Sequence, residues 1–157
     1  MSICCFTGHR RIEDAVMDPL TDLLDEKIEA LIAEGVTDFR TGGALGFDTL
    51  AAIRVLMARA THPECKLHLV LPCPDQDARW NARDRSIYRH ILERADSVTY
   101  VGNAPTAWWM YARNRALVDG ADLVIAYQTS AKGGTAYTCN YAATHGVRVI
   151  NLFEELK

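Results

Sequence analysis

The stretch ADLVIAYQ, residues 121–128, decides the fold class, because almost every position in it is apolar. A strand with water on one side alternates apolar and polar residues. An uninterrupted apolar run is instead typical of a parallel strand that helices cover on both faces. A turn with two glycines and a helical stretch, 134–146, follow this run. This order of strand, turn and helix is the unit from which parallel α/β sheets are built.

The same unit recurs along the rest of the chain. Apolar runs predict further strands at 2–8, 37–43, 66–72, 96–102 and 147–153, and helical periodicity predicts helices at 18–35, 47–60, 78–95 and 105–120. In the first helix, Asp18 suits the N-cap, Pro19 the first helical position and Gly35 the exit. We therefore expect an α/β fold with one domain over residues 1–157. Its sheet should be Rossmann-like, open and mainly parallel, with helices on both faces.

Composition argues against several classes of protein. The net charge of -3 gives no general attraction to nucleic acid or to an anionic membrane. No apolar run approaches the roughly 20 residues of a membrane span, so we expect no membrane partner. The five cysteines and five histidines show no metal-binding spacing, and no metal site is expected. Scattered cysteines in odd number fit a reducing compartment, which predicts a cytoplasmic protein.

Ligands of open parallel sheets bind beyond the carboxyl ends of the strands, so the turns after the predicted strands are candidate sites. After the first strand, Thr7 offers a hydroxyl group and Gly8 allows close approach of the backbone. His9 and Arg10 follow and can donate hydrogen bonds to an anion. Glycine turns at strand ends are common, so this turn alone is equally compatible with a structural role.

The turn after the second strand contains Gly42, Gly43 and Gly46 and opens directly into a helix. Free backbone N–H groups and the helix dipole make such an N-terminus suitable for phosphate. The spacing matches neither the dinucleotide GxGxxG motif nor a P-loop. Asp48 has two interpretations: it caps the helix, or it accepts a hydrogen bond from a ribose or a base.

A second glycine-rich turn, with Gly133, Gly134 and Thr135, follows the strand at 121–128. Two such turns at one edge of a sheet could face a common phosphate-bearing ligand. Gln76 and Trp80 follow the third strand and are further candidates for a contact with a base or a ribose.

Five segments in this order resemble the SLOG superfamily, in its YpsA-like branch: FTGHR, TGGALGFDTLAA, LPCPDQDARW, RNRALVDGADLVIAY and GGTAYTCNYA. The superfamily also contains the DNA-processing protein DprA and the LOG-type phosphoribohydrolases. The resemblance covers nearly the whole chain. It implies a Rossmann-like fold and a nucleotide or nucleic-acid ligand, and for the YpsA-like branch a role in sensing nucleotide derivatives.

The chain departs from the LOG-type enzymes at one position. Those enzymes carry a PGGxGTxxE signature whose glycines and threonine hold phosphate and whose glutamate acts at the glycosidic bond. Gly133, Gly134 and Thr135 match the first part, but Thr138 stands where the glutamate would be. A hydroxyl group cannot replace a carboxylate that shuttles a proton. The resemblance therefore implies a phosphate cradle without its acid.

The helix at 105–120 carries Arg113 and Asn114 at positions similar to the family. This helix runs away from the ligand edge, so we expect Trp108 and Trp109 to lie nearer the site than Arg113. Either tryptophan could stack on a base, or belong to the core or to the surface of a homodimer.

Three functions remain open from the sequence. The first, which we favour, is a cytosolic protein that binds or senses a nucleotide or a derivative such as ADP-ribose or NAD. It would require no cofactor, and Arg10 would balance the phosphate charge. The second is a LOG-like N-glycosidase with Asp48 as the substitute acid. The third is binding of single-stranded DNA, against which the acidic net charge counts.

Overall fold

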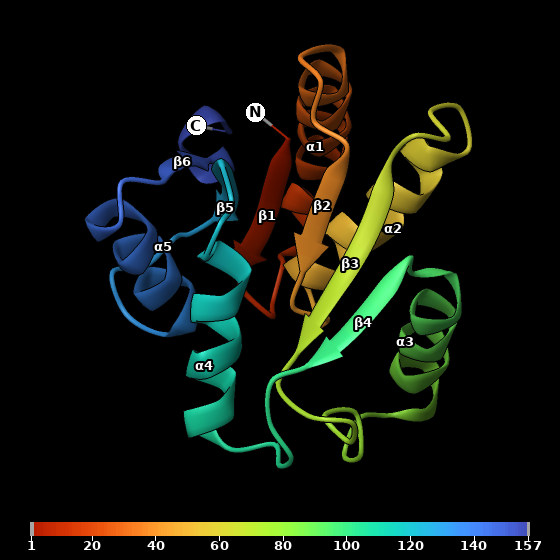
Figure 1. The fold of residues 1–157 in the computed structure, drawn as a ribbon, viewed down its shortest axis with the longest axis vertical. Coiled ribbons are helices and arrows are strands. Elements are labelled where there is room, and N and C mark those ends of the chain that lie inside the picture. The colour runs from red at the N-terminus through yellow and green to blue at the C-terminus, as the bar shows by residue number, and fades with distance from the viewer. Residues whose placement is uncertain (1, 157) are drawn as a thin grey trace.

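The computed structural model describes residues 2–156 and contains a six-stranded sheet in which neighbouring strands are parallel. The strands are β1 (Ile3–Gly8), β2 (Asp38–Thr41), β3 (Lys66–Leu71), β4 (Ser97–Tyr100), β5 (Leu123–Tyr127) and β6 (Arg148–Asn151). Their order across the sheet is β4-β3-β2-β1-β5-β6. The prediction of an α/β fold with an open parallel sheet is confirmed (Figure 1).

Helices cover both faces of this sheet. They are α1 (Asp14–Ala33), α2 (Phe47–Arg59), α3 (Ala82–Arg94), α4 (Ala107–Val118), α5 (Gly134–Thr144) and α6 (Leu152–Glu155). The helices α1, α2 and α3 form one layer, in which α2 contacts both neighbours and α6 lies against α1. The helices α4 and α5 pack against each other on the opposite face.

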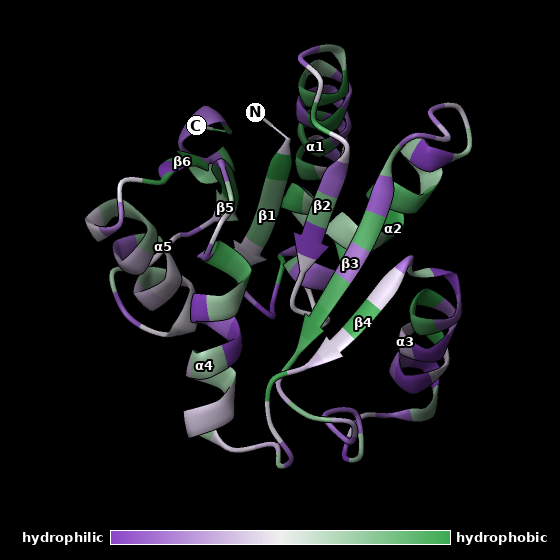
Figure 2. Cartoon of the chain, viewed as in Figure 1, coloured by the Kyte–Doolittle hydropathy of each residue, from purple (hydrophilic) through white to green (hydrophobic). Residues whose placement is uncertain are grey.

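Each face of the sheet has its own hydrophobic core. On one face Phe6 of β1 packs with Phe47 of α2, and both are fully buried. On the other face Cys5 of β1 belongs to the same cluster as Leu117 of α4 and Cys139 of α5. All five residues of β5 are buried, as expected for a strand covered on both sides. In Figure 2 hydrophobic residues run along β1 and much of β3, whereas hydrophilic residues predominate along α3.

The prediction for the start of the first helix was wrong. The helix α1 begins at Asp14, and Pro19 lies inside it rather than at its first position. Packing offsets the lost backbone hydrogen bond, because Val16 contacts the core from the extra turn. The hydroxyl group of Thr21 also donates to the Met17 carbonyl, at 2.8 Å. At the other end, Gly35 follows the helix with a φ of 99°, which agrees with the predicted exit.

Asparagine side chains set two further boundaries that differ from the prediction. The helix α3 begins at Ala82 rather than at residue 78, because the side chain of Asn81 accepts the backbone N–H of Asp84 at 2.8 Å and caps it. The last strand ends at Asn151 rather than at residue 153. Its side chain accepts the N–H of Phe153 and starts the short helix α6, which apolar periodicity did not predict.

The direction of the chain across the sheet reverses between β1 and β5. From β1 the chain builds β2, β3 and β4 outward on one side, and it then returns to β5 on the other side of β1. Thr7 and Gly8, at the end of β1, pair with Ala126 and Tyr127 of β5. In open α/β sheets the crevice at such a reversal is where ligands bind.

Candidate functional site

A cavity of about 320 Å³ opens at the carboxyl ends of β1 and β5, where the chain direction reverses. We call it the switch-point pocket. Its wall comes from the end of β1 and the loop after it, the start of α2, the inner side of α4 and the first turn of α5. The lining residues are Thr7, Gly8, His9, Arg10, Ala44, Asp48, Ala107, Met110, Tyr111, Arg113, Asn114, Gly134 and Thr135.

Thr7 and Gly8 at the end of β1, and His9 and Arg10 directly after it, all line this pocket as predicted candidates. Gly8 is required by packing, because a Cβ atom there would lie 2.5 Å from the ring of Phe47. Arg10 is exposed, and its guanidinium group reaches across to the sulfur of Met110 on α4, at 3.9 Å. The positive charge of Arg10 therefore lies at the mouth of the pocket, where an anion would meet it.

His9 joins the two loops that flank the pocket. Its Nε2 atom accepts the backbone N–H of Thr129, which follows β5, at 2.8 Å. An accepting Nε2 places the ring proton of the neutral imidazole on Nδ1. Burial lowers the pKa of His9, which favours this neutral form. The residue thus fixes the loop after β1 to the loop after β5.

The glycines of the β2–α2 turn lie behind the pocket wall rather than in it. Gln76 is buried, and its Nε2 atom donates to the carbonyl oxygens of Gly42 and Gly43, at 3.5 and 3.3 Å. The same atom also donates to the hydroxyl group of Tyr88, at 3.1 Å. The turn thus presents carbonyl groups to the protein interior, and Gln76 does not line the pocket.

The N-terminus of α2 is also closed by the protein itself. The N–H group of Phe47 donates to the His9 carbonyl oxygen at 3.0 Å. Gly46 has a φ of 79°, and a Cβ atom there would lie 2.2 Å from the carbonyl oxygen of Arg10. The glycine therefore permits close packing of the turn against the loop after β1, and of this segment only Ala44 and Asp48 reach the pocket.

Asp48 is a buried carboxylate in the pocket wall, with 6% of its surface exposed. Its side chain accepts the N–H of Ala44 at 3.2 Å, and no side-chain hydrogen bond caps α2, so the helix-cap interpretation was wrong. Burial raises the pKa of Asp48 to about 6, although the nearby charge of Arg113 and the Ala44 hydrogen bond favour the ionised form. Such a shift is typical of functional carboxylates.

Arg113 lies in the pocket wall as well, contrary to the prediction that Trp108 and Trp109 lie nearer the site than Arg113. It is buried, and it donates to the Gly42 carbonyl and to the side-chain oxygen of Asn114. A Cβ atom on Gly42 would lie 2.6 Å from Arg113 Nη1 and 2.9 Å from Asp48 Oδ2. The absence of a side chain at Gly42 therefore leaves room for the carboxylate of Asp48 and the guanidinium group of Arg113.

The prediction for Arg113 failed because side chains of a helix point toward its N-terminus. A long side chain from the second turn of α4 thus reaches back to the ligand edge. The two tryptophans of the first turn lie elsewhere: Trp108 is 71% exposed, and it does not line the pocket. Trp109 packs beneath Gly102, where a Cβ atom would lie 2.1 Å from its ring. Tyr111, which no sequence motif pointed to, lines the pocket instead.

The second predicted cradle, at the start of α5, does face the pocket. Gly134 and Thr135 line it, and Gly133 precedes them with a φ of 95° and open space around it. The N–H groups of the first helical turn have no partner within the helix, so they are free for an anion. Thr138, in place of the LOG-type glutamate, is fully buried and donates to the Gly134 carbonyl at 2.8 Å.

Two other features concern the whole described chain. Within residues 2–156, no group of three or more His, Cys, Asp or Glu side chains could hold a metal ion. No helix in this range combines the length and the apolar character that crossing a bilayer requires.

Fold and pocket together define a Rossmann-like α/β protein with a polar pocket at the topological switch point. The family model described as the YspA SLOG family (YpsA) matches residues 4–149, and the chain belongs to this family. It is 33% identical over 147 residues to the UPF0398 protein BH1768 of Halalkalibacterium halodurans, covering 87% of this chain and 78% of the relative.

Solved structures of DNA processing protein A, DprA, share the fold. The protein from Streptococcus pneumoniae superposes with a TM-score of 0.66 at 17% identity, over 94% of this chain and 49% of that one. DprA from Helicobacter pylori, whose structure is described by its single-stranded DNA binding mode, gives a TM-score of 0.67 at 21% identity. That match covers 94% of this chain and 63% of the DprA chain. This chain thus spans about half to two thirds of the length of these two proteins.

Proposed function

We propose that the chain binds a nucleotide or a nucleotide derivative, such as ADP-ribose or NAD, in the switch-point pocket. The observation that carries this proposal is the convergence of a free helix N-terminus, an exposed arginine and a buried carboxylate on one cavity at the strand reversal. A volume of about 320 Å³ is at the small end for ligand pockets, so the pocket would hold one nucleotide unit, either a mononucleotide or one half of ADP-ribose or NAD.

The chemistry of the wall assigns a part of the ligand to each side. Phosphate would accept hydrogen bonds from the first turn of α5 at Gly134 and Thr135, with Arg10 as the counter-charge. Asp48 would accept a hydrogen bond from a ribose hydroxyl or a base amino group. No cofactor takes part in this binding. A cytosolic setting belongs to the same proposal, supported by five cysteines that are all unpaired and buried.

Asp48 also supports a second candidate, hydrolysis of an N-glycosidic bond. A pKa of about 6 leaves part of this buried acid protonated near neutral pH, as a general acid requires. Thr138 is buried against Gly134 and offers no acid to the pocket, so Asp48 would have to supply the proton.

Binding of single-stranded DNA is the third candidate, and the comparison with DprA is the observation that favours it. In the sequence, the net charge of -3 counts against it. Binding of single-stranded DNA and binding of a nucleotide differ in how their affinity depends on salt. Binding of an oligonucleotide weakens steeply with ionic strength as counterions are released, whereas one phosphate group gives a shallow dependence.

Titration calorimetry with AMP, ADP-ribose, NAD and a thymidine oligonucleotide distinguishes these candidates. We expect a nucleotide to bind with one-to-one stoichiometry and to be recovered intact after long incubation, as mass spectrometry would show. Free base together with ribose phosphate would establish hydrolysis, and turnover that Asp48→Asn abolishes with binding retained would assign the acid. Arg83→Gln removes an exposed arginine of α3 that does not line the pocket, so it controls for the effect of net charge on binding. Binding of the oligonucleotide alone would overturn the nucleotide proposal.

A further inference from the structure

Part of the sheet on the α4 side carries polar side chains. The helix α4 contacts β1 and β3, and α5 contacts β1, β5 and β6, whereas no described helix lies in front of β4 on this face in Figure 1. Here Asp38, Arg40, His68 and Ser97 line a second cavity of about 360 Å³. This cavity shares no lining residue with the switch-point pocket.

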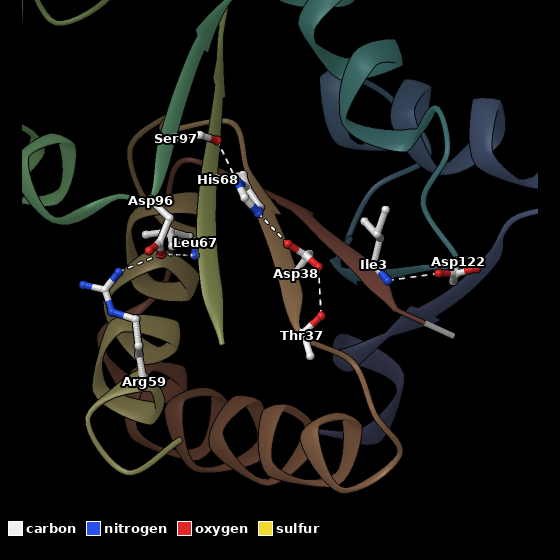
Figure 3. A network of polar contacts seen from close by, with 9 residues as sticks. All are labelled: Ile3, Thr37, Asp38, Arg59, Leu67, His68, Asp96, Ser97 and Asp122. Carbon is white, nitrogen blue, oxygen red and sulfur yellow. Dashed lines mark hydrogen bonds and ion pairs between the residues drawn. The ribbon is translucent and has the colours of Figure 1, made fainter. Parts of the chain in front are cut away.

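Three of these side chains form a continuous hydrogen-bonded relay across three neighbouring strands (Figure 3). The hydroxyl group of Ser97 on β4 lies 2.6 Å from His68 Nδ1 on β3. His68 Nε2 lies 2.7 Å from Asp38 Oδ1 on β2. The other carboxylate oxygen of Asp38 accepts the hydroxyl proton of Thr37 at 2.8 Å. The parallel register fixes this arrangement, because His68 and Ser97 are direct partners across the strands.

One assignment of protons satisfies every member of the relay. Burial alone would raise the pKa of Asp38, but the hydrogen bonds from His68 and Thr37, together with nearby positive charge, hold the pKa below its ordinary value. The ionised carboxylate accepts the Nε2 proton of His68, which leaves Nδ1 as the acceptor of the Ser97 hydroxyl proton. Carboxylate, imidazole and hydroxyl group are connected as in the triad of serine hydrolases, with the two ring nitrogens exchanged.

We propose that Ser97, His68 and Asp38 form a reactive site separate from the switch-point pocket, in which Ser97 is a nucleophile toward small carboxylic esters. The Ser97 oxygen bonds to the ester carbonyl carbon, and its proton passes to His68 Nδ1. The bond from that carbon to the alcohol oxygen then breaks, and the alcohol leaves with the proton from His68. Water attacks the acyl group in the same way, which releases the carboxylic acid and restores the Ser97 hydroxyl group.

Arg40 supplies the positive charge of this cavity. It is the partner of His68 across the strands and therefore lies on the same face. Its Nη1 atom donates to the carbonyl oxygens of Leu117 and Asp119, at 3.2 and 2.7 Å, which fixes the guanidinium group in the cavity wall. A fixed cation stabilises the oxyanion that forms when an ester carbonyl is attacked. The volume of about 360 Å³ limits the substrate to a small ester.

Hydrolysis of p-nitrophenyl acetate by the whole chain tests the proposal. We expect p-nitrophenolate release, with acetate on Ser97 in peptide mass spectra of samples quenched with acid. All five cysteines are buried, so they do not compete for the ester. Ser97→Ala should abolish the release, and His68→Gln should slow it by about 100-fold or more, the range for a lost general base. Ser86→Ala, an exposed serine on α3, should react like the wild type.

Asp38 acts through His68, as a positioning residue. In Asp38→Asn the amide can donate to Nε2, which moves the ring proton to Nδ1 and removes the acceptor for Ser97. Asp38→Glu keeps a carboxylate and should recover part of the rate, which a purely structural role would not predict. Equal unfolding curves would show that the variants fold. No release above that of Ser97→Ala, or His68→Gln at the wild-type rate, would overturn the proposal.

Discussion

Asp48 carries a free-energy cost that a purely structural residue would not need to carry. Burial raises the pKa of its carboxyl group to about 6, from an ordinary value of 3.8. The folded chain therefore binds this proton more tightly than the unfolded chain. Because of this, the contribution of Asp48 to stability is most favourable below pH 4 and is lost as the pH rises from about 4 to about 6. A difference of one in pKa between the folded and unfolded chains corresponds to about 1.4 kcal/mol, so the cost at neutral pH is about 3 kcal/mol.

Asp48→Asn should remove this cost and stabilise the chain. At pH 8 the free energy of unfolding should exceed that of the wild type by up to about 3 kcal/mol, and the difference should shrink as the pH falls toward 4. Urea denaturation at both pH values measures it. Asp18→Asn, which removes an exposed carboxylate on α1, is the matched control. An equal difference at both pH values would mean that the carboxylate is not destabilised by burial.

Alanine substitutions at Gly46 and Gly133 distinguish the cost of backbone strain from the cost of steric overlap. Both have positive φ angles, 79° and 95°, so alanine strains the backbone at either position by about 1–3 kcal/mol. At Gly133 nothing lies within 4 Å of the added atom, whereas at Gly46 the atom would overlap the carbonyl oxygen of Arg10. We therefore expect Gly46→Ala to lower the free energy of unfolding clearly more than Gly133→Ala. Urea denaturation of the two variants checks this, and equal losses would contradict the close contact.

Among the elements, α5 differs from α2 in what its N-terminus can hold. The first N–H group of α2 already donates to His9, whereas Gly134 and Thr135 of α5 line an open pocket. Both turns have the same glycine-rich appearance in the sequence. The difference arises from the approach of the loop after β1, which is a contact between distant segments. Local sequence could therefore predict two candidate cradles but could not distinguish them.

Thr135→Val tests the α5 cradle. If its hydroxyl group donates to phosphate, the loss of a hydrogen bond to a charged group should weaken nucleotide binding by about 10- to 100-fold. Affinity for the corresponding nucleoside, which lacks phosphate, should be unchanged, and calorimetry measures both. Thr138→Val is the matched control, because Thr138 lies one turn further along α5 and does not line the pocket. Equal losses for nucleotide and nucleoside would place the phosphate elsewhere.

At the level of the whole molecule, the alternation of strands and helices followed from apolar periodicity, because the two layers bury that pattern on both faces of the sheet. The composition of the pocket did not follow. Arg113, Asn114 and Tyr111 come from α4, whose position over β1 depends on the long crossover from β4 to β5. No local signal encodes that crossover. The carboxyl ends of β1 and β5 were predictable, since glycine-containing turns mark both.

The pocket joins elements from the beginning and the end of the chain, so a ligand should stabilise the molecule as one unit. At 100 times its dissociation constant, a nucleotide that binds only the folded state adds about 2.7 kcal/mol. For a chain of this length that corresponds to a rise of about 5–10 °C in Tm. We expect one transition, because α4 and α5 cannot separate from β1 without opening the pocket. Arg10→Gln should reduce the shift and Arg83→Gln should keep it, as scanning calorimetry would show. A ligand-dependent second transition would mean that the ligand holds only one layer.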